Sequence, residues 1–280
     1  MKVKNIMSSP VYIVNSDDTV AYARNLMMKH KVGSILVVDN SLIVGIFTKS
    51  DLKTRLFEDK AAWKRRPIDQ IPVKSLCTPD VSTLFPNTTV SEAAKLMVEK
   101  KVDHIPIFEK EVLGIVSKTD MIRFASENLT YPQVGDSMSG KAVTVNVNHT
   151  LNHIIDEMDK NDVQKVIVMD NNEKAVGIVS MKDLSTNKLV GDDGKRNVRD
   201  TKKTATKASR FAIDVPFIAK DIMTDIIVAD VSESIASASK KIIENNVVSL
   251  PVTRNGKIAG MISKDDILKC LAENYESQEE

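Results

Sequence analysis

The heptapeptide Gly45-Ile46-Phe47-Thr48-Lys49-Ser50-Asp51 decides how this chain is organised, because similar heptapeptides follow it three more times. They begin at Gly114, Gly177 and Gly260, and each ends on an aspartate three residues after a serine or threonine. Self-similarity of this kind indicates that one supersecondary unit has been repeated along the chain. We therefore expect four similar units and up to four similar sites.

Around each heptapeptide the apolar pattern predicts the same order of elements. A short strand is expected first, and then a helix with apolar residues at i, i+3 and i+7, such as Val20, Ala23 and Met27. Two further strands follow, and a second helix begins near the motif aspartate. The predicted unit is therefore β-α-β-β-α, and the fold class is α/β (α+β). The expected first strands are residues 11–14, 81–84, 142–145 and 226–229.

The spacing of the motif aspartates places one insertion. Asp183 and Asp266 are 83 residues apart, whereas the two earlier intervals are 69 and 63 residues. The extra residues are rich in Lys and Arg and contain few large apolar groups, which is typical of a flexible segment. The expected divisions are repeat 1 at 1–57, repeat 2 at 68–126, repeat 3 at 131–187, a basic insert at 188–211 and repeat 4 at 212–275, paired as modules 1–126 and 127–280.

The composition predicts a soluble cytoplasmic protein. Hydrophobic residues make up 42% of the chain and charged residues 28%, while the net charge of +1 gives no overall field to attract nucleic acid or a membrane. The two cysteines, Cys77 and Cys270, lack metal-ligand spacing and do not suggest a disulfide framework. No stretch is typical of a signal peptide or a transmembrane helix.

The four heptapeptides, each preceded by an apolar strand that often contains proline, as at Pro106 and Pro251, resemble the motif of CBS domains. The resemblance covers almost the whole chain, apart from the basic insert and residues 57–70. Four copies in one chain are similar to the γ subunits of AMP-activated protein kinases. This resemblance implies that the repeats pair into two Bateman modules, which stack into a flat disk.

The resemblance further implies adenine nucleotides (AMP, ADP or ATP) bound in clefts between paired repeats. The motif aspartate would hold the ribose, the motif hydroxyl would lie near phosphate, and adenine would lie near the first strand of each repeat. The implied ribose ligands are Asp51, Asp120, Asp183 and Asp266; the hydroxyls near phosphate are Thr48, Ser117, Ser180 and Ser263; and the residues near adenine are Ile13, Thr83, Thr144 and Val228.

Basic residues near the motif are candidates for neutralising phosphate. The related γ subunits often have Arg or His at the start of the strand before the motif hairpin, where this chain has His104 and Lys165, with Lys182 as a further candidate. Ser34 and Ser249 occupy the same position in the other repeats, which predicts weaker polyphosphate binding there. The lysines that follow the motif hydroxyls, Lys49, Lys118 and Lys264, are expected to face water.

The motif chemistry fits two interpretations. A carboxylate can accept hydrogen bonds from both hydroxyls of a ribose, and a helix N-terminus favours phosphate. The same Ser/Thr-x-x-Asp pattern before an apolar helix is also typical of a capping box, in which the two side chains only complete the helix start. The residues alone leave both interpretations open.

The sequence therefore predicts an adenine-nucleotide sensor that signals to a regulated protein, for which the resemblance suggests a kinase, and it leaves a homodimer open. Two alternatives remain: a nucleic-acid-associated regulator that uses the basic insert, and a sensor of S-adenosylmethionine. We expect no enzymatic activity, catalytic cofactor or metal, because no catalytic motif is present and the pair His149 and His153 lacks a third ligand.

Overall fold

The computed structural model describes residues 1–40, 42–56, 67–140, 142–181 and 217–274. The chain divides into two compact units, Met1–Leu129 with the chain from Leu268 onward, and Thr130–Ile267. None of the helices within the described residues is long and apolar enough to cross a membrane. The second helix expected in repeat 3, the residues of the basic insert, Asp183 and Lys182 lie outside the described residues.

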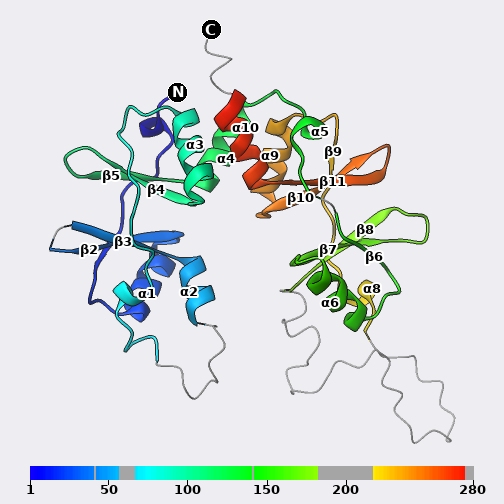
Figure 1. Ribbon diagram of the computed structural model, residues 1–280, viewed down its shortest axis with the longest axis horizontal. Helices are drawn as coiled ribbons and strands as arrows, with labels where there is room; N and C mark the ends of the chain where they lie inside the picture. The colour runs from blue at the N-terminus through cyan, green and yellow to red at the C-terminus, as the bar shows by residue number, and fades with distance from the viewer. Residues whose placement is uncertain (41, 57–66, 141, 182–216, 275–280) are drawn as a thin grey trace, which may run out of the picture. The chain divides into compact units, whose positions relative to one another are not determined.

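The described elements follow the predicted order in four repeats (Figure 1). Repeats 1 and 2 contain η1 (Val3–Asn5), β1 (Ile13–Asn15), α1 (Val20–His30), β2 (Ser34–Asp39), β3 (Leu42–Thr48), α2 (Lys49–Leu56), η3 (Val73–Ser75), α3 (Val90–Lys100), β4 (His104–Phe108), β5 (Val112–Ser117) and α4 (Lys118–Asn128). Repeats 3 and 4 contain α5 (Val134–Ser137), β6 (Thr144–Asn146), α6 (Leu151–Lys160), β7 (Lys165–Met169), β8 (Ala175–Ser180), α8 (Ala219–Ile222), β9 (Ala229–Asp230), α9 (Ile235–Glu244), β10 (Ser249–Arg254), β11 (Lys257–Ser263) and α10 (Lys264–Asn274).

Each repeat is built on a small mixed sheet. In repeat 1, β1 is parallel to β2, and β2 is antiparallel to β3. The same order is found in repeats 3 and 4. Repeat 2 differs, because only β4 and β5 form a described sheet, and residues 81–84 contribute a single bridge from Leu84 to Ile107. The prediction of a full first strand at 81–84 was therefore wrong.

Proline explains where the first strands are shortened. The amide of Leu36 donates to the carbonyl of Tyr12, and the amide of Ile167 donates to that of Val143 at the matching place in repeat 3. Repeats 2 and 4 have Pro106 and Pro251 at this position, and proline has no N–H to donate. Parallel pairing therefore begins one residue later, and β9 is only two residues long.

The first helix of each repeat begins where the sequence provides a hydroxyl. The N-cap side chain accepts a hydrogen bond from the backbone amide three residues further on, which satisfies one of the otherwise unpaired donors of the first turn. These N-caps are Thr19, Thr89, Thr150 and Ser234. The apolar stripe predicted for these helices is buried, as shown by Val20, Ala23 and Met27, which are at most 1% exposed.

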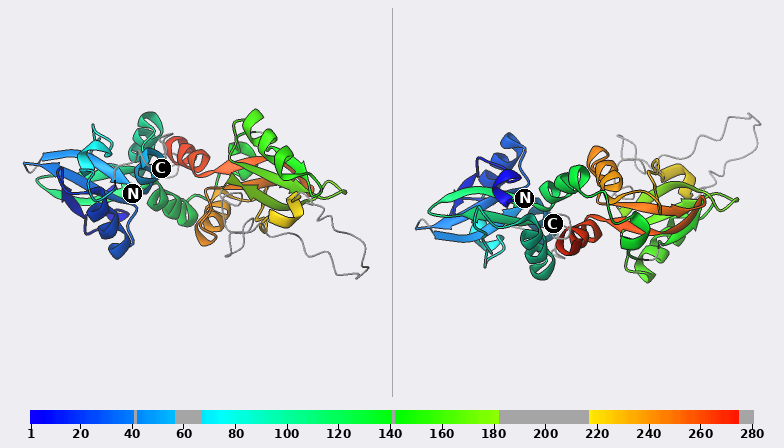
Figure 2. Two further views of the ribbon diagram at one scale, coloured as in Figure 1. Left: turned by 90° about the horizontal axis from the view of Figure 1, so that it is seen from below. Right: turned by 90° about the horizontal axis from the view of Figure 1, so that it is seen from above.

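Within each unit, two sheets lie between two sets of helices (Figures 1 and 2). In the first unit, α1 and α2 lie outside the sheet of repeat 1, and α3 and α4 lie outside the sheet of repeat 2. Leu36, Ile46 and Ile115 form a buried cluster between the two sheets. Burial of this apolar surface favours pairing of the repeats over separate folding.

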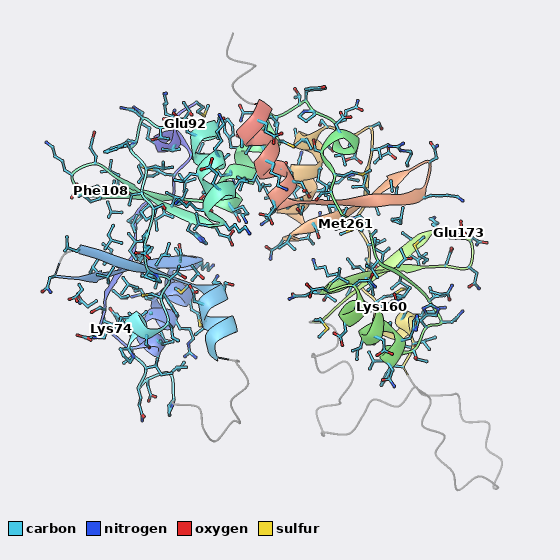
Figure 3. The ribbon with its side chains drawn as sticks, in the orientation of Figure 1. Lys74, Glu92, Phe108, Lys160, Glu173 and Met261 are labelled. Carbon is cyan, nitrogen blue, oxygen red and sulfur yellow. The ribbon has the colours of Figure 1, made fainter. Side chains whose placement is uncertain are left out.

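The segment that starts each repeat packs on the other repeat of its pair. We call residues 3–8, 73–78, 134–139 and 219–224 the exchanged segments. The amide of Val3 donates to the carbonyl of Thr88, and Ser8 exchanges two backbone hydrogen bonds with Ile115 of repeat 2. In the opposite direction, Val73 lies in the core of repeat 1. Figure 3 shows Lys74 of η3 beside the helices of that repeat.

The second unit repeats this exchange. The amide of Val134 donates to the carbonyl of Glu233, and the amide of Ser139 donates to that of Met261, so the segment of repeat 3 lies on repeat 4. Ala219 and Ile222 of α8 are buried in the core of repeat 3. The exchanged segments therefore complete the partner repeat rather than their own.

Candidate functional site

The motif hydroxyl and aspartate form the reciprocal hydrogen bonds of a helix start in each of the three described motif copies. In repeat 2, the amide of Asp120 donates to Ser117 Oγ at 3.2 Å, and the Ser117 amide and hydroxyl donate to Asp120 Oδ2 at 2.9 and 2.6 Å. Thr48 with Asp51 and Ser263 with Asp266 repeat these contacts. Capping therefore occupies one carboxylate oxygen of each aspartate.

The other carboxylate oxygen faces a hydroxyl from an exchanged segment. Thr78 Oγ1 donates to Asp51 Oδ1 at 3.3 Å, and Ser8 Oγ donates to Asp120 Oδ1 at 3.4 Å. Ser139 donates to Asp266 Oδ1 in the same way. These hydroxyls are exposed, whereas Asp120 and Asp266 are only 8% and 5% exposed. Each such site is therefore assembled from both repeats of a pair.

Sequence reasoning missed these hydroxyls, although a signal was present. Each exchanged segment ends on a serine or threonine directly after Met or Cys, namely Ser8, Thr78, Ser139 and Thr224. Thr224 lies at the corresponding place in repeat 3, where its hydroxyl donates to the carbonyl of Ile178 at 3.3 Å. The motif predicted four aspartates with their capping hydroxyls, but not the second hydroxyl that crosses from the paired repeat.

The strand before the motif hairpin brings the candidate phosphate ligands close to the motif hydroxyls. His104 on β4 pairs with Ser117, and Lys165 on β7 pairs with Ser180. The imidazole of His104 also reaches the paired repeat, because a Cβ placed on Gly33 would lie 3.5 Å from its Nε2. Repeats 1 and 4 have Ser34 and Ser249 at the equivalent register, opposite Thr48 and Ser263.

The environment of His104 favours its neutral form. Burial lowers the pKa of the imidazole below its usual value, and the Lys118 ammonium acts in the same direction. The carboxylates of Asp103, Asp120 and Asp51 act in the opposite direction without reversing the shift. Two of these carboxylates belong to the motifs of the two repeats, so the imidazole senses both sites.

Lys118 differs from the sequence prediction. It was expected to face water, but its side chain is only 20% exposed and forms an ion pair with Asp103. The ammonium lies near the site, as its effect on the pKa of His104 indicates. Lys49, the equivalent residue of repeat 1, is exposed as expected.

The second unit contains a cavity of about 640 Å³ between β6, the β7–β8 hairpin and the start of β11. Figure 3 shows Glu173 at the tip of the β7–β8 hairpin, where it forms a 3.1 Å ion pair with Lys257. The cavity is lined by Ala142, Thr144, Val145, Asn146, His149, Met169, Asp170, Asn171, Glu173, Lys257 and Ile258.

The residues predicted to lie near adenine occupy different settings. Thr144 lines the cavity, so this candidate lies in a space open to a ligand. Ile13 is 45% exposed at the start of β1, and Thr83 is also exposed. Val228 is partly buried, and its carbonyl accepts a hydrogen bond from Lys241 Nζ at 3.0 Å.

His149, which lines the cavity, lies next to His153. His149 and His153 lie edge to face with ring centroids 4.2 Å apart. Within the described parts of the chain, no group of three His, Cys, Asp or Glu residues could hold a metal ion.

Comparison with known proteins finds the same four-part organisation. The family model described as "CBS domain" matches residues 3–58, 73–127, 134–188 and 219–273. An uncharacterized 17.7 kDa protein of Acidianus ambivalens is 35% identical over 125 residues, which cover 44% of this chain and 71% of the relative.

Two solved structures cover nearly the whole chain. A conserved protein from Pyrococcus horikoshii is 21% identical with a TM-score of 0.64, covering 97% of this chain and 100% of its own. MJ1225 from Methanocaldococcus jannaschii, described as a proposed archaeal homologue of g-AMPK, is 21% identical with a TM-score of 0.61 and covers 96% and 99% of the two chains. At these identities the similarity establishes the fold.

Proposed function

Because all four matched segments make this chain a member of the CBS-domain family, we propose that it is a regulatory protein that binds adenine nucleotides between paired repeats. Occupancy of these clefts would be transmitted to a partner protein, and the chain itself would have no enzymatic activity. The observation that carries the proposal is the second oxygen of the motif aspartate. It is free of the capping contacts and faces a hydroxyl from the paired repeat.

Ribose chemistry fits this arrangement. Its adjacent hydroxyls can both donate to a carboxylate, and hydrogen bonds to a charged acceptor are stronger than those between neutral groups. The hydroxyls of Thr78 and Ser139 are exposed, so either could turn from the carboxylate towards a bound ribose. Capping need not be lost on binding, because it uses the other carboxylate oxygen. The two interpretations of the motif are therefore compatible.

The rest of the nucleotide has candidate partners in both units. His104 lies opposite Ser117, where a phosphate group would meet both a basic side chain and the start of α4. Lys165 lies opposite Ser180. In the second unit, Thr144, a candidate for the adenine contact, lines a cavity of about 640 Å³. This geometry favours AMP, ADP or ATP over S-adenosylmethionine, whose sulfonium is cationic.

Calorimetric titration of the full chain with adenosine, AMP, ADP, ATP and S-adenosylmethionine tests the proposal. We expect AMP or ATP to bind, and Asp266→Asn to weaken binding at its site about 10- to 100-fold, since a hydrogen bond to a charged group contributes about 1.5–3 kcal/mol. Asp265→Asn is the matched control, because it removes an exposed carboxylate from the adjacent position. Absence of binding by all five compounds, or equal effects of the two variants, would contradict the proposal.

A further inference from the structure

Asp120 differs from the other described motif aspartates in having a cationic partner. Arg123 Nη1 donates to Asp120 Oδ1 at 3.0 Å, and the two side chains are 55% and 9% exposed. The bond uses the same oxygen that accepts the Ser8 hydroxyl at 3.4 Å. The carboxylate oxygen that capping leaves available is therefore already paired with a guanidinium.

Repeats 1 and 4 lack this arrangement within their described side chains. Among the described side chains, Asp51 and Asp266 form no ion pair, and their Oδ1 atoms accept hydrogen bonds from the neutral hydroxyls of Thr78 and Ser139. The residue three positions after the aspartate is Thr54 in repeat 1, Thr186 in repeat 3 and Lys269 in repeat 4. Arg123 is therefore the only arginine at this position of the motif.

From this difference, and resting on the function proposed above, we infer that Arg123 is a specificity-determining residue that lowers the affinity of the Asp120 cleft for ribose. A ribose entering this cleft must displace a guanidinium from Asp120, whereas the described partners that it displaces from Oδ1 of Asp51 and Asp266 are hydroxyls. The charged contact is the stronger one. The Asp120 cleft therefore binds ribose more weakly than the other two and fills at higher nucleotide concentrations.

Adenosine is the probe that tests this inference, because it has no phosphate with which Arg123 could interact. In calorimetric titrations of the full chain, Arg123→Gln is expected to tighten binding at the Asp120 cleft about two- to fivefold, the range that corresponds to a partly exposed ion pair. In the titration, this change appears as more adenosine molecules bound per chain at low adenosine concentration. Lys269→Gln is the matched control, because it removes an exposed basic residue from the same motif position and should add none.

A double variant tests whether the added adenosine binding occurs at the Asp120 cleft. If Asp120→Asn abolishes the binding that Arg123→Gln adds, the inference is supported; if the gain persists, it is overturned. Weaker AMP binding with unchanged adenosine binding would show that Arg123 is a phosphate ligand and would also overturn it. Adenosine binding that is identical in wild type and Arg123→Gln contradicts this inference alone, whereas no binding of adenosine, AMP or ATP by either protein contradicts the proposed function as well.

Discussion

At the scale of single residues, the motif glycine makes room for the exchanged segment. A Cβ on Gly114 would lie 2.5 Å from Met7 Sδ and 3.1 Å from the Ser8 carbonyl oxygen. The corresponding distance from Gly45 to Cys77 Sγ is also 2.5 Å, and that from Gly177 to Met223 Sδ is 2.6 Å. The Met or Cys at the end of each exchanged segment therefore fits against a glycine.

We expect Gly114→Ala to destabilise the protein by about 1–3 kcal/mol, the usual cost of overpacking, because a backbone oxygen as well as a flexible side chain must move. Urea unfolding monitored by circular dichroism measures this change. Gly33→Ala is the matched control, since its Cβ would meet only His104 Nε2 at an ordinary 3.5 Å. Equal stability of the two variants would contradict the packing argument.

We expect His104 to make the proposed nucleotide binding depend on pH. Its pKa in the free protein is lowered by burial, so the imidazole is neutral at pH 7. A bound phosphate would raise this pKa, and binding would then take up a proton. We expect AMP affinity to increase as pH falls from 7.5 to about 6, while adenosine affinity stays nearly constant.

Titrations in buffers of different ionisation enthalpy measure the proton uptake directly. In His104→Gln, the AMP affinity should lose most of its pH dependence. A pH dependence that is unchanged in this variant would show that His104 does not contact phosphate.

The lowered pKa of His104 also affects the free energy of unfolding. This free energy should decrease as pH falls, whereas AMP affinity should increase. Because the folded-state pKa of His104 lies below the unfolded value of about 6.5, the unfolded chain binds more protons in the interval between the two. Stability without ligand should therefore fall as pH decreases below about 6.5. The His104→Gln variant should show a smaller decrease in urea unfolding over the same interval.

At the scale of elements, the exchanged segments make each repeat depend on its partner's chain. Val73 is fully buried in the core of repeat 1, although it starts repeat 2. Val3 is likewise fully buried, and its backbone is bonded to Thr88 of repeat 2. Truncation of Val73 should therefore remove contacts in repeat 1, and truncation of Val3 should remove contacts in repeat 2.

We expect Val73→Ala to cost about 1.5–3 kcal/mol and to increase hydrogen exchange in α1 and β2 more than in α3 and β4. Val3→Ala should show the reverse pattern and serves as the matched control. Hydrogen exchange read by mass spectrometry distinguishes the two. Faster exchange in α3 and β4 after the Val73 change would contradict the exchange of segments.

Much of the fold was predictable from local patterns, but the exchange was not. The i, i+3, i+7 stripe identified the buried residues of α1 and α3 because burial follows helix periodicity. The shortened strands of repeats 2 and 4 could also have been predicted, since Pro106 and Pro251 are visible in the sequence. The amphipathic pattern of residues 3–7 shows that one face is buried, but it does not show which of two similar repeats covers that face.

The parts of the candidate site that are local in sequence were predictable, whereas the contacts between repeats were not. The hydroxyl and aspartate of each motif are close in sequence, and their capping contacts follow from a spacing of three residues. Ser8 and Asp120 are 112 residues apart, so only the path of the exchanged segment brings them together. The ion pair of Arg123 with Asp120 is local, but the motif pattern did not single it out.

At the scale of the whole molecule, the proposed ligand should stabilise the folded chain in proportion to the number of sites it fills. A ligand at 100 times its Kd adds about 2.7 kcal/mol for each site that exists only in the folded state. We expect urea unfolding with AMP to show a stabilisation that decreases in Asp51→Asn and Asp266→Asn. The Asp265→Asn control should keep the full effect, and stabilisation that is insensitive to all three variants would place AMP elsewhere.

The exchange of segments also has a consequence for how the number of repeats evolves. A gene that lost a single repeat would leave its partner with an uncovered groove where the foreign segment had been, so such a loss would be selected against. Gains and losses should therefore occur in steps of two. The pair of repeats, rather than the single repeat, is then the unit that is inherited.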